Sequence, residues 1–241
     1  TYPSSYDGKI RYTSSNISVA SLSGRIVNFN KIGRVLLSAK FERSKNYEDA
    51  TLYVVLDVLK ANQAIIPSEL PTEKPLKDFT SIPISATSTS GAPVYIELMD
   101  GSAASISGTL GNFELVTKNQ TGMVTITYFT VENDHPNYYT ATLKFSLDIV
   151  KLNQNISFEP EPPIEIMYTE NLELSIDAVS DSNLDVSLEK QDRGSSLFEN
   201  QTLSFTDVGE VYITAEQPGN QFYNPSTANR VITIIQGLTE L

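Results

Sequence analysis

Few residues in this 241-residue chain could carry out acid–base or metal chemistry. The chain contains one histidine, His135, in the polar segment 132–137, and no cysteine. A Ser-His-Asp triad would need His135 as its base, and no Gly-x-Ser-x-Gly nucleophile turn is present. Without thiolates or a second imidazole, a transition-metal site is disfavoured. We therefore interpret His135 as a solvated loop residue and expect no catalytic residue and no bound metal of this kind.

Carboxylates could carry out two further kinds of chemistry. Glu159, Glu161 and Glu165 lie close together in the sequence, and glycoside hydrolysis uses a pair of carboxyl groups. These glutamates alternate with prolines, however, so we interpret them as a charged edge that discourages strand pairing. Calcium prefers oxygen ligands, and Asp57 and Asp148 fall near joints between repeats, but no Asp-x-Asp-x-Asp-Gly loop occurs. We expect no cofactor, with calcium as the alternative ion.

Composition and charge exclude further classes of function. The formal net charge is −12, which disfavours binding to a phosphate backbone. No run approaches the roughly 18 apolar residues of a membrane span. Residues 1–61 carry nine Lys/Arg and five Asp/Glu, whereas residues 153–241 carry three and fifteen. We interpret this asymmetry as variation among exposed faces. The alternative is a polarity that favours head-to-tail contacts or an anionic partner near the N-terminal end.

Internal repeats organise the whole chain. The segment 56–65 returns at 147–156, an offset of 91 residues. A second block has the pattern Gly-x-Val-x-Ile or Gly-x-Val-x-Leu and begins at Gly33, Gly122 and Gly209. Each glycine precedes a strand-like run, so we expect it to supply a turn with positive φ.

A tyrosine follows each of these blocks after a polar loop. The three tyrosines are Tyr47, Tyr138 and Tyr223, and each leads into a further strand-like run. Their position resembles the tyrosine corner of immunoglobulin-like folds, where the hydroxyl ties a loop to the backbone. We interpret them as structural anchors, with a ligand-binding aromatic as the alternative.

The repeats alternate with a period of two. Val124, Ile126 and Tyr128 alternate with Thr125 and Thr127, which is typical of a strand with one buried and one wet face. Short strands at regular spacing between polar turns predict an all-β protein built of β-sandwiches in tandem. No segment shows sustained helical periodicity.

The repeat spacing predicts three units: a partial one at 1–59 and two full ones at 60–150 and 151–241. In the first unit, Gly8 to Tyr12 aligns with Gly91 to Tyr95, which lies well inside the second unit. The first unit therefore lacks its opening strands, and we expect either preceding residues in a natural polypeptide or another chain to fill the gap.

Together these motifs resemble bacterial immunoglobulin-like (Big-type) repeats. They comprise Lys-Ala-Asn-Gln at the start of a unit, the Gly-x-Val blocks, and Asn-x-x-Tyr-Asn before the last strand. The resemblance implies tandem immunoglobulin-like sandwiches in a linear arrangement, as in large surface proteins and adhesins and also in virion proteins. It implies no catalytic residues.

The sequence thus predicts a non-catalytic structural or adhesion segment, a stalk or spacer of a long extracellular surface protein. No Gly/Ser-rich linker separates the units, so we expect a semi-rigid rod. The implied partners are other copies or neighbouring domains of the same protein, and cell-surface or envelope components, with no nucleic acid and no membrane span. The alternatives are a virion fibre or decoration protein and a glycan- or protein-binding module. A glycan- or protein-binding module would need exposed loop aromatics such as Phe79, Phe113, Phe129 and Phe198.

Overall fold

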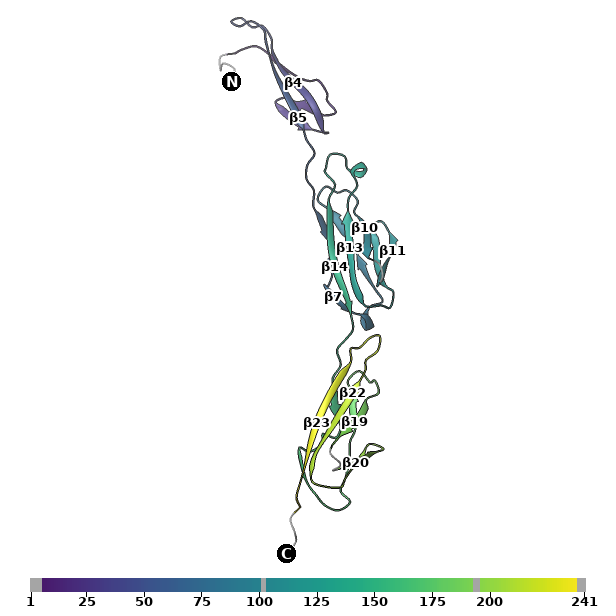
Figure 1. The fold of residues 1–241 in the computed structure, drawn as a ribbon. Helices are drawn as coiled ribbons and strands as arrows, with labels where there is room; N and C mark the ends of the chain where they lie inside the picture. The colour runs from purple at the N-terminus through teal and green to yellow at the C-terminus, as the bar shows by residue number, and fades with distance from the viewer. Residues whose placement is uncertain (1–5, 101–102, 193–195, 238–241) are drawn as a thin grey trace.

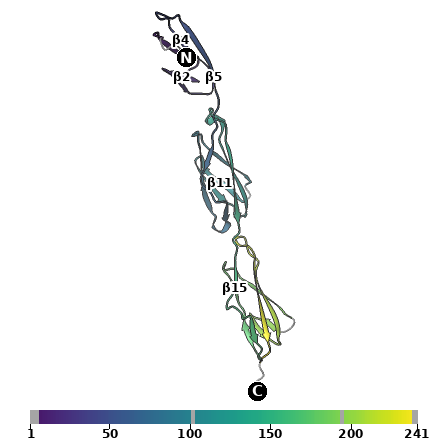
Figure 2. The same ribbon diagram turned by 90° about the vertical axis from the view of Figure 1, so that its left-hand side faces the viewer.

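The computed structural model describes residues 6–100, 103–192 and 196–237, which form strands, two 3-10 turns and no α-helix. We call the three successive groups of strands the N-terminal module (β1–β5), the middle module (β6–β14) and the C-terminal module (β15–β23). The modules follow one another in a line, with β4 and β5 towards one end and β23 towards the other (Figures 1 and 2). The predicted all-β fold of tandem immunoglobulin-like sandwiches is confirmed.

The middle module is a complete two-layered sandwich. Its elements are β6 (Ile65–Pro67), β7 (Glu73–Pro75), η1 (Leu76–Asp78), β8 (Ser81–Ile84), β9 (Ala86–Ser88), β10 (Tyr95–Asp100), β11 (Ala104–Thr109), β12 (Asn112–Thr117), β13 (Gly122–Phe129), η2 (Glu132–Asp134) and β14 (Thr142–Val150). One sheet has the order β10-β13-β14-β7 and the other β11-β12-β8, with β6 paired to β9. Strand β7 runs parallel to β14, and the other pairings are antiparallel.

The C-terminal module repeats this topology strand for strand. Its strands are β15 (Ile156–Phe158), β16 (Glu165–Met167), β17 (Glu173–Ser175), β18 (Ala178–Ser180), β19 (Ser187–Gln191), β20 (Ser196–Glu199), β21 (Thr202–Phe205), β22 (Gly209–Gln217) and β23 (Ser226–Ile235). The sheets have the orders β16-β23-β22-β19 and β17-β21-β20, with β15 paired to β18. Strand β16 runs parallel to β23, as β7 does to β14.

The N-terminal module matches only the last five strands of the other two. Its strands are β1 (Ile10–Ser14), β2 (Ala20–Ser23), β3 (Ile26–Phe29), β4 (Gly33–Phe41) and β5 (Ala50–Val58). They form a β1-β4-β5 sheet and a β2-β3 hairpin. Within residues 6–58 there is no counterpart of β6 to β9, in agreement with the expectation that the first unit lacks its opening strands.

The alignment of the first unit on the second was wrong by one residue. Tyr12 pairs with Ala39 of β4. The residue equivalent to Ala39 in the middle module is Tyr128, and it pairs with Ile96 and not with Tyr95. Because side chains alternate along a strand, a one-residue shift exchanges its two faces. The identity of two tyrosines suggested the alignment, whereas the sheet register depends on which side chains face the core.

The three block glycines begin the strands β4, β13 and β22. Their φ values are 142° at Gly33, 143° at Gly122 and 150° at Gly209, which agrees with the predicted positive φ. This part of backbone space is almost closed to residues with a Cβ atom. At Gly33 an added Cβ would also lie 3.0 Å from Val19 Cγ2. The glycines therefore let the strand start next to the packed side chains of its own module.

Each module closes its own apolar interior. The cluster of the middle module includes Leu115, Ile126 and Leu147, all fully buried, and that of the C-terminal module includes Ile213 and Ile232. Among the described residues, the cluster of the N-terminal module has only three buried members, which are Val19, Ala20 and Val35.

Missing strands explain why the N-terminal cluster is small, because residues 6–58 contain no counterparts of β6 and β8, which add Ile65, Ile82 and Ile84 to the middle core. Strand β5 corresponds to β14, and β7 pairs with only the last three residues of β14. The core-facing Leu52 is 61% exposed, and Val54 is 46% exposed. Their counterparts Leu143 and Phe145 are partly buried and pack against the middle core. Apolar surface that the other modules remove from water thus stays hydrated here.

This difference predicts unequal costs for the same truncation. Ile213→Ala in the C-terminal module should lower its free energy of unfolding by about 2–5 kcal/mol, because Ile213 is fully buried. Leu37→Ala at the matched position of β4 should cost less, because Leu37 is only partly buried. Native-state hydrogen exchange resolved by module would measure both effects. Equal costs, or loss of protection in the middle module of either variant, would contradict separate cores.

Candidate functional site: the joints between the modules

The candidate catalytic groups are not brought together. The His135 ring contacts the ring of Tyr138 edge-on at 4.7 Å. No hydrogen bond found among the described residues joins its side chain to a hydroxyl or a carboxylate. Glu161 forms an ion pair with Arg230 at 3.0 Å. Neither arrangement provides a nucleophile next to a base, or two free carboxyl groups facing one another.

The candidate calcium ligands are also separated. Asp57 accepts two hydrogen bonds from Arg34, at 2.7 and 2.9 Å, and these bonds hold the pKa of Asp57 below its usual range. A cation at Asp57 would have to displace the guanidinium group. Asp148 is exposed on β14, a whole module away. Across the described parts of the chain, no group of three or more His, Cys, Asp or Glu residues could hold a metal ion.

The aromatics considered for ligand binding do not form an exposed patch. Phe79 is 2% exposed and belongs to the middle core. Phe113 packs against the same core. Phe129 is partly buried and stacks on Tyr95 with ring centroids 5.6 Å apart, and Phe198 packs against the C-terminal core. A glycan would therefore find no stacking platform on these four rings.

The most organised polar structures lie instead where one module passes to the next. Between β5 and β6, Ala61 N donates to Asn137 O and Ala61 O accepts from Tyr139 N, both at 2.9 Å. Between β14 and β15, Leu152 makes the same pair of bonds with Phe222 O and Asn224 N, both at 2.8 Å. Each connecting segment thus forms a short parallel bridge to a loop of the following module.

A glutamine follows each bridge, and it is buried at Gln154 and partly buried at Gln63. Gln154 is 4% exposed, and its amide nitrogen donates to Asn224 O at 2.6 Å and to Gln217 Oε1 at 3.2 Å. Its amide oxygen accepts from the hydroxyls of Ser180 at 2.8 Å and Ser182 at 2.6 Å. One side chain thus links the connecting segment to two separate loops of the C-terminal module.

Gln63 plays the same part in the middle module. Its nitrogen donates to Tyr139 O at 2.7 Å and to Thr130 Oγ1 at 3.1 Å, and its oxygen accepts from Ser90 at 2.6 Å. Thr130 is the counterpart of Gln217, and Ser90 of Ser182. In the sequence, both glutamines stand out only as members of the segment that occurs at 56–65 and again at 147–156. The available signal for a hydrogen-bonding role was an uncharged polar residue that precedes an apolar strand in both copies.

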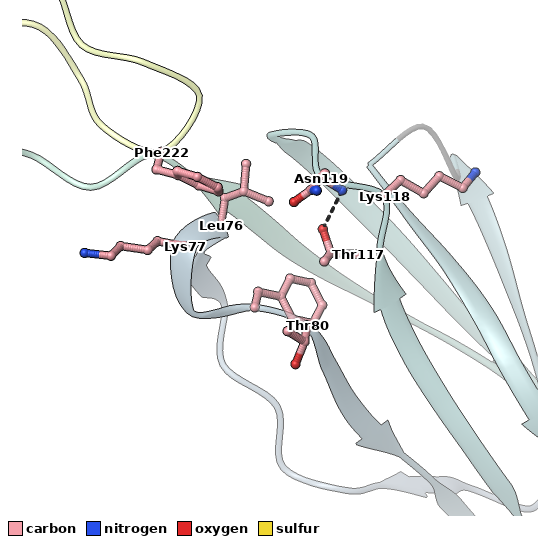
Figure 3. Close-up of a pocket in the computed structure, with 8 residues that line it drawn as sticks. Leu76, Lys77, Thr80, Thr117, Lys118, Asn119 and Phe222 are labelled. Atoms are coloured by element: carbon pink, nitrogen blue, oxygen red, sulfur yellow. Dashed lines mark hydrogen bonds between the residues drawn. The ribbon is translucent and has the colours of Figure 1, made fainter.

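The second joint is an apolar contact. Phe222, at the tip of the loop before β23, packs against the middle core next to Leu76, and it lines an open crevice between the modules together with Leu76 and Phe79 (Figure 3). Lys77 hydrogen-bonds the hydroxyl of Tyr223 and lies 4.9 Å from the centroid of its ring. This hydrogen bond raises the pKa of Lys77. The joint therefore combines apolar burial with a cation–π contact.

The first joint is polar at the same position. Asn137 is the counterpart of Phe222, since the carbonyl of each accepts a hydrogen bond from the connecting segment. The side chain of Asn137 accepts from Ile32 N at 3.3 Å and donates to Asn30 O at 3.5 Å. Both bonds are long, and the bond from Ile32 N is part-buried whereas the bond to Asn30 O is exposed.

The three predicted anchor tyrosines occupy equivalent loop positions and are partly buried. Tyr138 and Tyr223 form the bridges to Ala61 and Leu152. Tyr47, in the N-terminal module, contacts the ring of Tyr6 edge-on at 6.0 Å. The geometry adds a role at the joints, and their function as anchors stays a prediction.

Comparisons with known proteins found no matching family model and no matching curated protein. Among solved structures, the protocadherin GammaB4 extracellular domain is 14% identical, with a TM-score of 0.35; the match covers 95% of this chain and 43% of that one. Drosophila N-cadherin EC1-4 is 13% identical (TM-score 0.32), covering 96% and 67%. Surface layer protein SbsC, domains 4-9, is 12% identical (TM-score 0.31), covering 94% and 39%.

The glutamine networks predict a specific loss of stability. Gln154→Ala should lower the free energy of unfolding of the C-terminal module by about 1–3 kcal/mol, because it leaves Asn224 O and the serine hydroxyls without their buried partner. Gln191→Ala, on the exposed face of β19, is the control and should change stability by less than about 0.5 kcal/mol. Denaturant unfolding would measure both. If both substitutions changed the free energy of unfolding equally, the Gln154 hydrogen bonds would make no net contribution to stability.

Proposed function

We propose that this chain is a non-catalytic spacer, a stalk segment of a long extracellular surface protein with a structural or adhesive role. The observation that carries the proposal is the pair of backbone-bridged joints at Ala61 and Leu152. A connection that is hydrogen-bonded to the following module cannot act as a free linker. Modules with separate cores and bridged connections form a rod, and a rod holds whatever lies at its end away from the surface.

We propose units with the boundaries 1–59, 60–150 and 151–241. The separate apolar clusters support this division, and residues 1–5 and 238–241 lie outside the described residues. The partners in this proposal are neighbouring domains or other copies of the same protein, and components of a cell surface or envelope.

The assignment to bacterial immunoglobulin-like repeats, and with it the location at a surface, rests on the repeated sequence blocks. No helix among the described residues is long and apolar enough to cross a membrane. The dispersed, partly buried aromatics give no support to a glycan-binding module.

Small-angle scattering of the 241-residue chain tests the spacer function. Three sandwiches in line, each about 40 Å long, should give a maximum dimension near 120 Å and a radius of gyration of about 35 Å. A single compact domain of this length would have a radius of gyration of about 18 Å. A compact particle would overturn the proposal. Addition of calcium or of a chelator should leave the profile unchanged, because no acidic cluster bridges the described modules.

A further inference from the structure

The two joints are a matched pair inside one chain. Both use the same backbone bridge and an equivalent glutamine, which is buried at Gln154 and partly buried at Gln63. The joints differ at the tip of one loop, which is Asn137 in the first joint and Phe222 in the second. The two tips also meet different surfaces, because Phe222 lines a crevice with Leu76 of η1 and residues 6–58 contain no counterpart of η1.

The Phe222 tip closes its joint by burial. Leu76 and Phe79 are 3% and 2% exposed and belong to the core of the preceding module. Tilting the C-terminal module away would expose the Phe222 ring and part of Leu76 to water, which costs free energy in proportion to the apolar area. It would also separate Lys77 from the Tyr223 ring.

The Asn137 tip has no comparable restoring force. Its contacts with Ile32 N and Asn30 O are two long hydrogen bonds, one part-buried and one exposed, and water can replace both once a tilt of the modules admits it to the joint. Lys60 lies 5.9 Å from the Tyr139 ring, but both residues precede or belong to the middle module and do not hold the N-terminal module. Few buried apolar contacts favour local mobility.

We propose that the identity of this tip residue sets the stiffness of each joint: Phe222 locks the middle and C-terminal modules together, whereas Asn137 leaves a hinge between the N-terminal and middle modules. The proposal deepens the spacer function and rests on it for its biological meaning. Phe222 is a positioning residue in this scheme. The rod is then stiff in its C-terminal two thirds and bends at one defined point.

Distance measurements between spin labels test this proposal directly, because the chain has no native cysteine. Exposed positions that flank the joints are Asn28 and Lys144 for the first and Met123 and Thr227 for the second. Cysteine pairs at these sites should give a distance distribution for the first joint about twofold wider than for the second. Equal widths in the unmodified joints would overturn the proposal.

Tip variants then assign the cause. Phe222→Asn should widen the Met123/Thr227 distribution to about the width of the first joint, and Phe222→Leu should keep it narrow, because leucine retains an apolar tip. Asn137→Ala should leave both distributions essentially unchanged. Circular dichroism melts check that each variant is folded. An unchanged second joint in Phe222→Asn would overturn the role of Phe222.

The scattering experiment separates the two levels of interpretation. A compact particle would contradict the spacer function itself. An elongated particle whose two joints gave equally wide distance distributions would agree with the spacer function. It would contradict only the proposal that the two joints differ in stiffness.

Discussion

The architecture depends on one repeated constraint, the hydrogen bonding of a glutamine side chain at the start of each full module. An amide that is buried or partly buried needs partners for its donors and acceptors, and Gln63 and Gln154 find these partners on loops of the module that follows the connecting segment. That requirement holds the segment against the following module. The parallel bridges at Ala61 and Leu152 complete the arrangement. The connection becomes part of the fold of the next sandwich, so the direction in which the chain enters that sandwich is defined.

Separate cores and defined joints together account for the elongated shape (Figure 1). Each of the two full sandwiches closes an apolar core of its own, so the two modules do not merge into a single core. The contact at Phe222 is the exception, since a residue of the C-terminal module packs on the core of the middle one. Contacts this small orient modules without merging them. The N-terminal module, which has no counterparts of β6 to β9 within residues 6–58, has a smaller core and an uncovered β5 edge.

The repeats made much of the fold predictable. Blocks with a period of two located the strands that begin at Gly33, Gly122 and Gly209, because a half-buried strand requires alternation. The offset of 91 residues predicted where one unit passes to the next. The register of β1 was not predictable from matching tyrosines, because register follows from the face that is buried. The burial of the loop aromatics was also not predictable from the sequence. Phe79 lies in a polar segment, which suggested an exposed ring, but it is a core residue.

The sequence alone determined that this protein consists of tandem β-sandwiches and has a single histidine and no cysteine, since local periodicity and composition express these properties directly. The tertiary structure decided what happens between the sandwiches. Gln154 meets Asn224, and Phe222 meets Leu76, across 70 or more residues of sequence. Such contacts depend on where loops of two folded layers come to lie, and no local pattern records that placement.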